Sequence, residues 1–285
     1  ELEGIEGLTI GMIDGGGIRF LQLNMTMEPT NDPNVVKAIA ASIDRNEIAD
    51  TVFGGQVAPL YSMVPPGFLG ANEAFDDTYA SPNLDAAKAF LADSGYTADN
   101  PLELDLWYPP EHYGAATASW MQIIEKQLEA TGAINVELQA QEWSTYITAL
   151  VGGESYPVGV LGWFFDYPDP SNYLDPFVYN GGMGNNLTAP MDGSITGDPI
   201  NDDAATLVDL LSKADVEVDD AKRIALYEEA QALYSELVPT VPLFFEAEHV
   251  IYRDNISGTA DQATPETLNI GGNVFFTYSM LQKSK

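Results

Sequence analysis

A stretch of eleven residues, Gly162–Asn172, combines side chains that a ligand-binding surface needs. Its sequence, GWFFDYPDPSN, contains four aromatic rings, two carboxylates and two prolines. A strand in the protein core would exclude the carboxylates, and a solvent-exposed loop would exclude the rings. The prolines exclude a continuous helix. The stretch therefore predicts a wall against which a ligand docks.

The composition excludes several kinds of active site and partner. The sequence has no Cys, and its two histidines, His112 and His249, are far apart, so neither thiol chemistry nor a zinc centre built on several histidines is expected. Neither a G-x-S-x-G nor a G-x-x-x-x-G-K-[ST] motif occurs. The net charge of −32 repels nucleic acid and favours solubility in a salty or extracellular setting. We expect no catalytic residue, metal or cofactor.

Helix and strand signals alternate along the chain, which predicts an α/β lobe. Apolar periodicity predicts helices over residues 31–48, 81–96, 113–132, 144–152 and 219–239. Strands are expected over residues 102–110, 134–143, 157–164 and 241–253. The polar segment 190–203 is expected to be a loop.

Turn and capping residues mark the ends of several of these elements. Asp32 followed by Pro33 starts one helix, and Ser81 followed by Pro82 starts the next. Asp14 and the three glycines after it supply the positive φ angles of a tight turn. Residues 8–25 are therefore expected to form two strands joined by a turn.

The order of these segments resembles the peptide/nickel-type extracellular solute-binding proteins of ABC importers, the family that includes dipeptide- and oligopeptide-binding proteins. Eight segments between residues 31 and 245 carry the resemblance: NDPNVVKAIAASIDRNEI, GGQVAPLYSMVPPG, SPNLDAAKAFLADSGY, LELDLWYP, INVELQAQEW, GWFFDYPDPSNYLDPF, DAKRIALYEEAQALY and VPLFF. The resemblance implies an α/β lobe of the type II periplasmic-binding-protein kind, with a mixed sheet flanked by helices.

Members of that family have two lobes that close on a ligand, so the resemblance implies that this chain is the C-terminal portion of a longer protein. Residues 26–243 would form the second lobe. Residues 1–25 and 244–285 would each hold a hinge strand and a remnant of the first lobe. The hinge strands, around Phe20–Asn24 and Leu243–His249, should lie side by side, with both chain ends at one edge.

The resemblance also assigns roles within GWFFDYPDPSN. In peptide-binding relatives the acid after the Gly-Trp pair, here Asp166, faces the cleft and holds the α-amino group of the ligand. A charge-assisted hydrogen bond of this kind is worth about 1.5–3 kcal/mol. The rings of Trp163 and Tyr167 would bury ligand side chains, and Trp163 could sit against a cation. A carboxylate that only caps the turn is the alternative.

Further candidates are carried over in the same way. Trp143 matches a position that lines the pocket in oligopeptide-binding relatives, although a core Trp between strand and helix is the alternative. Asn24 comes from the hinge strand and Tyr61 from the YSMVPPG segment. Asn185 and Asn186 follow GGMG in a loop that could reach the cleft.

One departure from the family concerns the cation that neutralises a peptide carboxylate. Peptide-binding relatives often use an Arg near this cleft, but between Lys88 and Lys213 the sequence has only Lys126 and no Arg. Either the absent lobe supplies the cation, or the ligand has no carboxylate. A longer peptide, an oligosaccharide or a cationic solute stays open, whereas free nickel is not expected without a His cluster.

The resemblance therefore implies a monomeric, non-enzymatic, extracytoplasmic protein that captures peptides or a similar small solute and delivers them to an ABC permease. Two alternatives from other classes stay open. One is a glycoside hydrolase with paired carboxylates. The other is a surface protein without a transport role, which would lack a cleft lined by Trp143 and Trp163.

Overall fold

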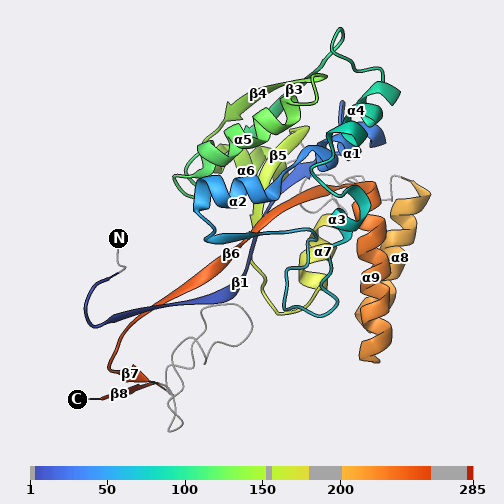
Figure 1. The fold of residues 1–285 in the computed structure, drawn as a ribbon. Coiled ribbons are helices and arrows are strands. Elements are labelled where there is room, and N and C mark those ends of the chain that lie inside the picture. The colour runs from blue at the N-terminus through green and yellow to red at the C-terminus, as the bar shows by residue number, and fades with distance from the viewer. Residues whose placement is uncertain (1–3, 152–155, 180–200, 258–280, 285) are drawn as a thin grey trace.

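A mixed six-stranded sheet forms the centre of the computed structural model, which describes residues 4–151, 156–179, 201–257 and 281–284. Its strands are β1 (Leu8–Leu23), β2 (Val57–Pro59), β3 (Leu102–Tyr108), β4 (Ile134–Ala140), β5 (Val158–Trp163) and β6 (Thr240–Arg253). Their order in the sheet is β2-β6-β1-β5-β3-β4 (Figure 1). β3 runs parallel to β4 and β5, and the other neighbours are antiparallel. A short pair, β7 (Ile256–Ser257) with β8 (Gln282–Lys283), lies apart from this sheet.

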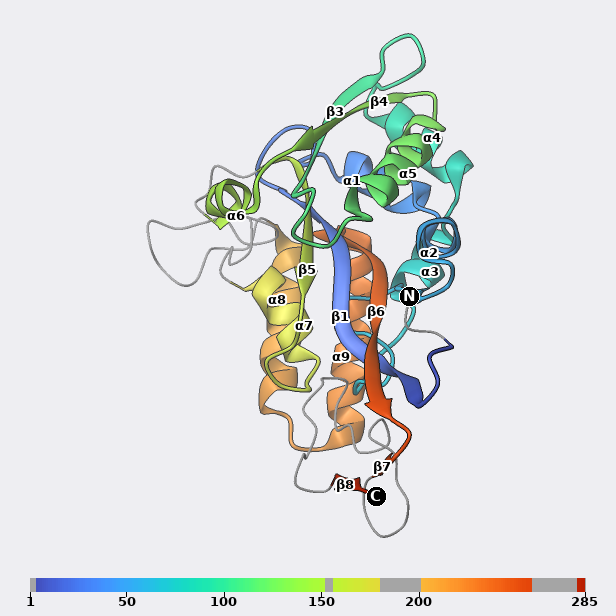
Figure 2. The ribbon, with the colours of Figure 1, turned by 90° about the vertical axis from the view of Figure 1, so that its left-hand side faces the viewer.

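Helices cover both faces of the sheet, which confirms the predicted fold class. They are α1 (Pro33–Ser42), α2 (Arg45–Phe53), α3 (Ala74–Tyr79), α4 (Leu84–Asp93), α5 (Thr117–Glu129), α6 (Trp143–Val151), α7 (Ser171–Val178), α8 (Asp202–Val216) and α9 (Asp220–Leu237). On one face, Trp120 of α5 and Phe53 of α2 pack against Phe244 of β6. On the other face, Phe177 of α7 packs against Phe20 of β1, and α7, α8 and α9 lie together (Figure 2). None of the described helices has the length and apolar character needed to cross a bilayer.

The long strands β1 and β6 pair with each other over most of their length. Phe20 lies opposite Pro242 and Leu8 opposite Arg253, and the backbone N–H of Asp254 donates to the carbonyl of Gly7 at 3.2 Å. The register confirms that these two strands are neighbours, and it brings Gly7 and Asp254, at their outer ends, side by side.

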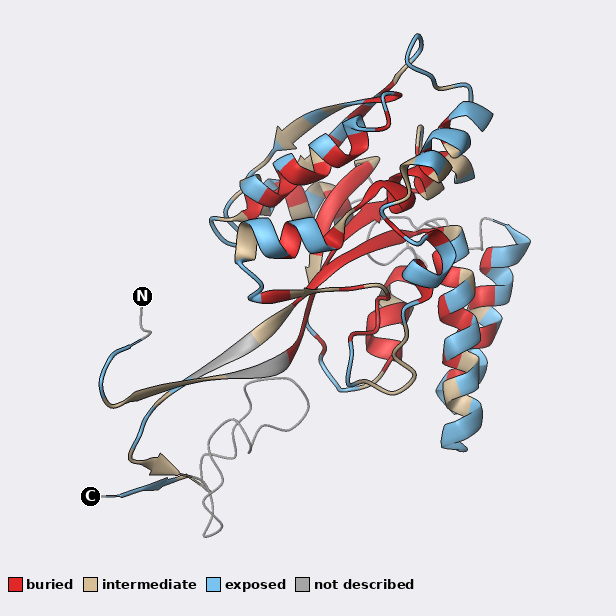
Figure 3. Cartoon of the chain, in the orientation of Figure 1, coloured by how far each residue is buried: buried red, intermediate tan, exposed pale blue. Residues whose placement is uncertain are grey.

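Beyond the sheet, β1 and β6 continue as a two-stranded ribbon. Residues 8–14 pair with residues 247–253, whereas β5 reaches only Ile18–Leu23 and β2 only Phe244–Glu246. Figure 3 shows that the central strands are buried, whereas the described part of the ribbon is largely intermediate in exposure. A two-stranded ribbon is of marginal stability in water by itself, so this one depends on the sheet from which it extends.

The expected turn at Asp14 is wrong, because residues 8–23 form one continuous strand. The three glycines instead form an irregularity, since four steps along β1 from Asp14 to Ile18 face two steps along β6. A side chain at Gly16 would overlap the ring of Phe165, and a Cβ at Gly17 would lie 2.6 Å from the ring of Phe164. The glycines therefore let two rings of the GWFFDYPDPSN stretch pack against the backbone of β1.

Two helix starts also differ from the prediction. The helix expected over residues 31–48 is divided into α1, capped by Asp32, and α2, capped by Asp44. Asn83 rather than Ser81 caps α4, because the hydroxyl of Ser81 accepts a hydrogen bond of 2.7 Å from the buried Arg45.

Three described helices, α3, α7 and α8, were not predicted. α7 contains Pro176, which weakens the sequence signal, and its first turn follows the prolines that were expected to form only a turn. α8 begins at Asp202, inside the expected loop, where Asn201 accepts from the backbone N–H of Ala204 at 2.8 Å.

Replacing Gly16 by Ala should destabilise the protein by roughly 1–3 kcal/mol, because the added methyl group has no space between the strand and the ring of Phe165. Urea denaturation of the variant measures the loss. The same change should cost less in a Phe165→Leu background, where the ring is gone, so equal costs in both backgrounds would contradict the packing described here.

Candidate functional site

Three neighbouring parallel strands lead into the candidate site: the carboxyl ends of β3 and β4 lie level with the start of β5, which continues to Trp163. β4, β3 and β5 lie side by side and run in the same direction. In open α/β sheets, ligands bind outside the carboxyl ends of the strands. The segments that follow these ends contain four predicted site residues, Trp143, Trp163, Asp166 and Tyr167.

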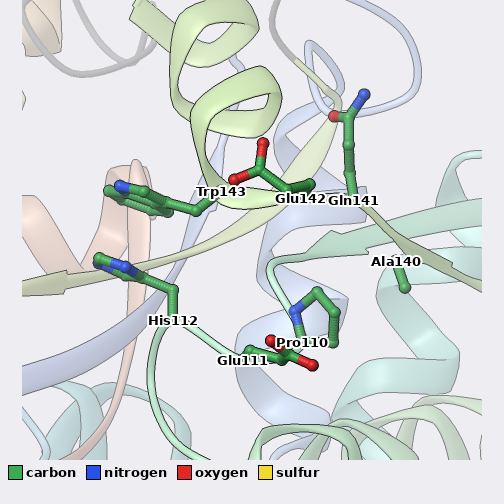
Figure 4. A pocket seen from close by; sticks show the side chains of 7 residues that line it. All are labelled: Pro110, Glu111, His112, Ala140, Gln141, Glu142 and Trp143. Carbon is green, nitrogen blue, oxygen red and sulfur yellow. The ribbon is translucent and has the colours of Figure 1, made fainter.

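A hollow of about 450 Å³ lies between the segments that follow β3 and β4 (Figure 4). It is lined by Pro110, Glu111, His112, Ala140, Gln141, Glu142 and Trp143. The rings of His112 and Trp143 are stacked, with centroids 3.5 Å apart and planes within 3° of parallel. This volume falls within the range of small-molecule sites in proteins, and Trp143 is half-buried at its wall rather than enclosed in the core.

A cation that the sequence analysis missed lies beside this hollow. Arg19 of β1 is 5% exposed, and its guanidinium donates to the carboxylate of Glu246 on β6 at 3.0 Å. The guanidinium carbon lies 4.6 Å from the ring centroid of Tyr113 and 5.3 Å from that of Phe164. Arg19 is far from the hollow in sequence and comes next to it through the pairing of β1 with β5, where it is opposite Gly162.

Tyr113 connects the buried Arg to the stacked rings. Its hydroxyl accepts a hydrogen bond of 2.9 Å from the backbone N–H of Gly162, and its ring meets that of Trp143 edge-on at 5.8 Å. Burial raises the pKa of Tyr113 to about 12, so this hydroxyl stays protonated at neutral pH. The side chain therefore joins three segments, from β1, β3 and β5, at the floor of the site.

Two titratable groups in the wall of the hollow have shifted pKa values. Burial, and then the positive charge of Arg19, lower the pKa of His112, so its imidazole is neutral at pH 7. Hydrogen bonds from Ser144 and Thr145 at the start of α6 lower the pKa of the exposed Glu142 carboxyl, so it is ionised. The wall is therefore neutral at His112 and negative at Glu142.

The GWFFDYPDPSN stretch leaves β5 and turns over the start of α7. Asn172 fixes this turn, because its side-chain oxygen accepts from the indole N–H of Trp163 at 3.1 Å and from the backbone N–H of Asp166 at 3.0 Å. Trp163 is half-buried against Phe177. Within the described part of the chain, no side-chain hydrogen bond or ion pair involves the exposed carboxylate of Asp166. Tyr167 is also exposed, at 48%.

The second acid of the stretch, Asp169, is held by hydrogen bonds within the protein. The carboxylate of Asp169 receives hydrogen bonds of 2.7 and 2.9 Å from the guanidinium of Arg223 on α9 and one of 3.0 Å from the backbone N–H of Ser171. Burial opposes ionisation, but these bonds prevail and lower the pKa of Asp169. Capping of the turn, which was the alternative role for Asp166, is therefore carried out by Asp169.

The other predicted residues that the structure describes do not line the hollow. Asn24 lies beside Pro157, at the opposite end of β5, where its side chain accepts from the backbone and hydroxyl of Thr26. Tyr61 follows β2 on the far side of the sheet and contacts Arg45. Asn185 and Asn186 lie outside the described residues. No group of three His, Asp or Glu side chains that could hold a metal ion is present in the described ranges.

Replacing Arg19 by Met should raise the pKa of His112 toward its ordinary value, because the nearby positive charge is removed while burial remains. An NMR titration of the imidazole signals measures the shift. Arg223→Met, which removes a cation bound to Asp169, serves as the control and should leave His112 unchanged. An unchanged pKa in the Arg19 variant would show that the guanidinium does not act on the pocket.

Comparison with known proteins gives the family. The model of the bacterial extracellular solute-binding proteins, family 5 (middle), matches residues 3–185. The oligopeptide-binding protein OppA of Bacillus subtilis is 26% identical over 255 residues, which cover 88% of this chain and 44% of OppA. The di/tripeptide-binding protein 2 of Pseudomonas aeruginosa is 30% identical over 241 residues, which cover 83% of this chain and 42% of that protein. The chain thus spans less than half the length of these two relatives.

A solved structure agrees with the fold. The murein tripeptide-binding protein MppA of Escherichia coli superimposes with a TM-score of 0.76 at 22% identity, over 100% of this chain and 51% of MppA. At this identity the likeness concerns the fold alone. Since the family model covers most of the chain, the predicted family is confirmed: the chain belongs to the bacterial extracellular solute-binding proteins of family 5.

Proposed function

We propose that this chain supplies one lobe of a two-lobed protein that captures a peptide between the lobes and presents it to an ABC permease. Residues 26–243 form the second lobe. Residues 1–25 and 244–285 contain the two hinge strands and the parts that join the first lobe. The protein acts outside the cytoplasm as a monomer and releases its ligand unchanged.

The observation that carries this proposal is the arrangement of the segments that follow β3, β4 and β5. A hollow with an indole in its wall and an exposed carboxylate, Asp166, lie on segments that follow adjacent parallel strands. Rings bury ligand side chains of different shapes, and the carboxylate binds an ammonium group. The relatives named as oligopeptide- and di/tripeptide-binding proteins favour a peptide as the ligand.

The ribbon of β1 and β6 supports the division into lobes. It extends past the last strand that pairs with it, and Ile251 on this ribbon is 49% exposed. Two adjacent strands that pass from one lobe to another can absorb the backbone rotation of closure. The ribbon is thus suited to be the hinge.

The carboxylate end of the peptide needs a cation from elsewhere. Arg19 is almost fully buried and is paired with Glu246, so it supports the floor of the site rather than contacting the ligand. We assign the cation for the ligand carboxylate to the first lobe. Because a peptide then touches both lobes, each lobe by itself makes only part of the contacts.

Asp166→Asn in the two-lobed protein should weaken peptide binding about 10- to 150-fold, because it removes the charge that binds the α-amino group. Isothermal titration calorimetry with a tripeptide measures the loss. The melting temperature of the ligand-free protein should be unchanged, because this carboxylate is exposed. An N-acetylated tripeptide should bind the wild type and the variant alike.

Asp169→Asn is the matched control for this variant. It keeps the same size and changes the charge by the same amount, but it replaces the carboxylate that Arg223 and Ser171 bind by a neutral amide with a single acceptor oxygen. It should destabilise the protein by about 1–3 kcal/mol and leave peptide affinity nearly unchanged. If Asp169→Asn weakened binding and Asp166→Asn did not, the assignment of the two acids would be reversed.

The 285-residue chain by itself should bind a tripeptide at least about 100-fold more weakly than the two-lobed protein, because half the contacts do not offset the entropy cost of association. Calorimetry on both proteins checks this ratio. Mass spectrometry of the ligand that copurifies with the two-lobed protein then identifies the chemical class of that ligand. A copurified sugar or lipid in place of peptides would contradict the proposal.

A further inference from the structure

The hollow between the segments after β3 and β4 has an acidic lining. Two of its seven lining residues, Glu111 and Glu142, are acids, and none is Lys or Arg. The single titratable base in the lining, His112, has a lowered pKa and is neutral at pH 7. The carboxylate of Glu142 is held ionised by the first turn of α6. The hollow is therefore negative at neutral pH.

The shape of the hollow complements a flat or elongated cation. In Figure 4 the stacked rings of Trp143 and His112 form one wall, with Glu142 and Glu111 on either side of the space next to it. The inner faces of these two rings are occupied by each other. A guanidinium binds carboxylates through several N–H groups at once and can stack only on an outer ring face. The methylene stem of the same side chain packs against apolar surface such as Pro110 and Ala140. The volume of about 450 Å³ is ample for one such side chain.

The nearest buried cation does not compete for this space. Arg19 donates to Glu246, and its guanidinium lies against the rings of Tyr113 and Phe164. Burial, and then the charge of Arg19, lower the pKa of His112, and among the described residues Arg19 forms no hydrogen bond or ion pair with Glu111 or Glu142.

We propose that this hollow is a specificity subsite for a basic side chain of the ligand, and that Glu111 and Glu142 select arginine there over neutral residues of the same size. The proposal rests on the proposed function, since it places a basic residue of a captured peptide in this subsite. It assigns a role to Glu111 that the resemblance to the family did not suggest.

The test uses the 285-residue chain, because every lining residue belongs to it. The probe is Nα-acetyl-L-argininamide, which carries no charged terminus and so tests the subsite without Asp166. Its neutral counterpart, Nα-acetyl-L-citrullinamide, has almost the same shape. NMR titration that follows the indole N–H of Trp143 and the imidazole of His112 should give a dissociation constant of about 1–10 mM for the arginine probe. The citrulline probe should bind at least about three-fold more weakly.

Glu111→Gln is the test variant and Glu137→Gln the matched control. Glu137 is exposed on β4 outside the hollow, so its replacement changes the net charge equally without changing the lining. Glu111→Gln should weaken the arginine probe about three- to ten-fold and leave the citrulline probe unchanged. Glu137→Gln should alter neither.

Three results would overturn the proposal. The first is equal binding of the two probes, and the second is absence of binding at a probe concentration of about ten times the expected dissociation constant. The third is an equal loss of affinity in both glutamate variants, which would indicate only the general electrostatic field of a chain with a net charge of −32. Peptide capture by the two-lobed protein is measured separately. Capture of peptides without a preference for basic ones would contradict the subsite and support the proposed function. Arginine selectivity without peptide capture would support the subsite and contradict the proposed function.

Discussion

The antiparallel pairing of β1 with β6 is the constraint on which the rest of the structure depends. These strands come from opposite ends of the chain, yet they lie at the centre of the sheet, with β2 on one side and β5 on the other. Their pairing closes a loop of more than two hundred residues, which only a large buried core can offset. It also brings Arg19 and Glu246 together beneath the parallel strands. One pairing thus sets both the proposed hinge and the floor of the candidate site.

The floor of the site shows how a buried charge is accommodated. Arg19 has one carboxylate partner, a backbone carbonyl, and two aromatic rings around its guanidinium. A buried charge that lost its partner would be costly, so Arg19 and Glu246 hold β1 and β6 in one register. Tyr113 lies between Arg19 and Trp143. The proposed hinge strand β1 is therefore connected to the wall of the hollow through three side chains.

The acids of the chain have distinct physical roles despite the uniform negative charge. Asp169 is held by Arg223 and fixes the turn after β5, whereas Asp166, three residues earlier, stays exposed at the edge. Glu142 caps α6 and faces the hollow at the same time. A net charge of −32 attracts cations to the whole surface, but only carboxylates in a shaped pocket can choose among them.

The sequence by itself determined the α/β class and most of the helices and strands, because apolar periodicity and caps are local signals. The order of the segments gave the resemblance to the family, and that resemblance implied that β1 and β6 are neighbours. The sequence did not determine the course of residues 8–23, since three glycines permit a turn and an irregular strand equally, and the rings of Phe164 and Phe165 decide between them. It placed Asn24 and Asp166 in one candidate set. In the structure Asn24 lies beside the start of β5 and Asp166 follows its end, and the six residues of this strand span about 17 Å. The sequence by itself missed Arg19 and could not say which acid caps the turn. These features depend on which strands become neighbours in the sheet, and only tertiary packing settles that.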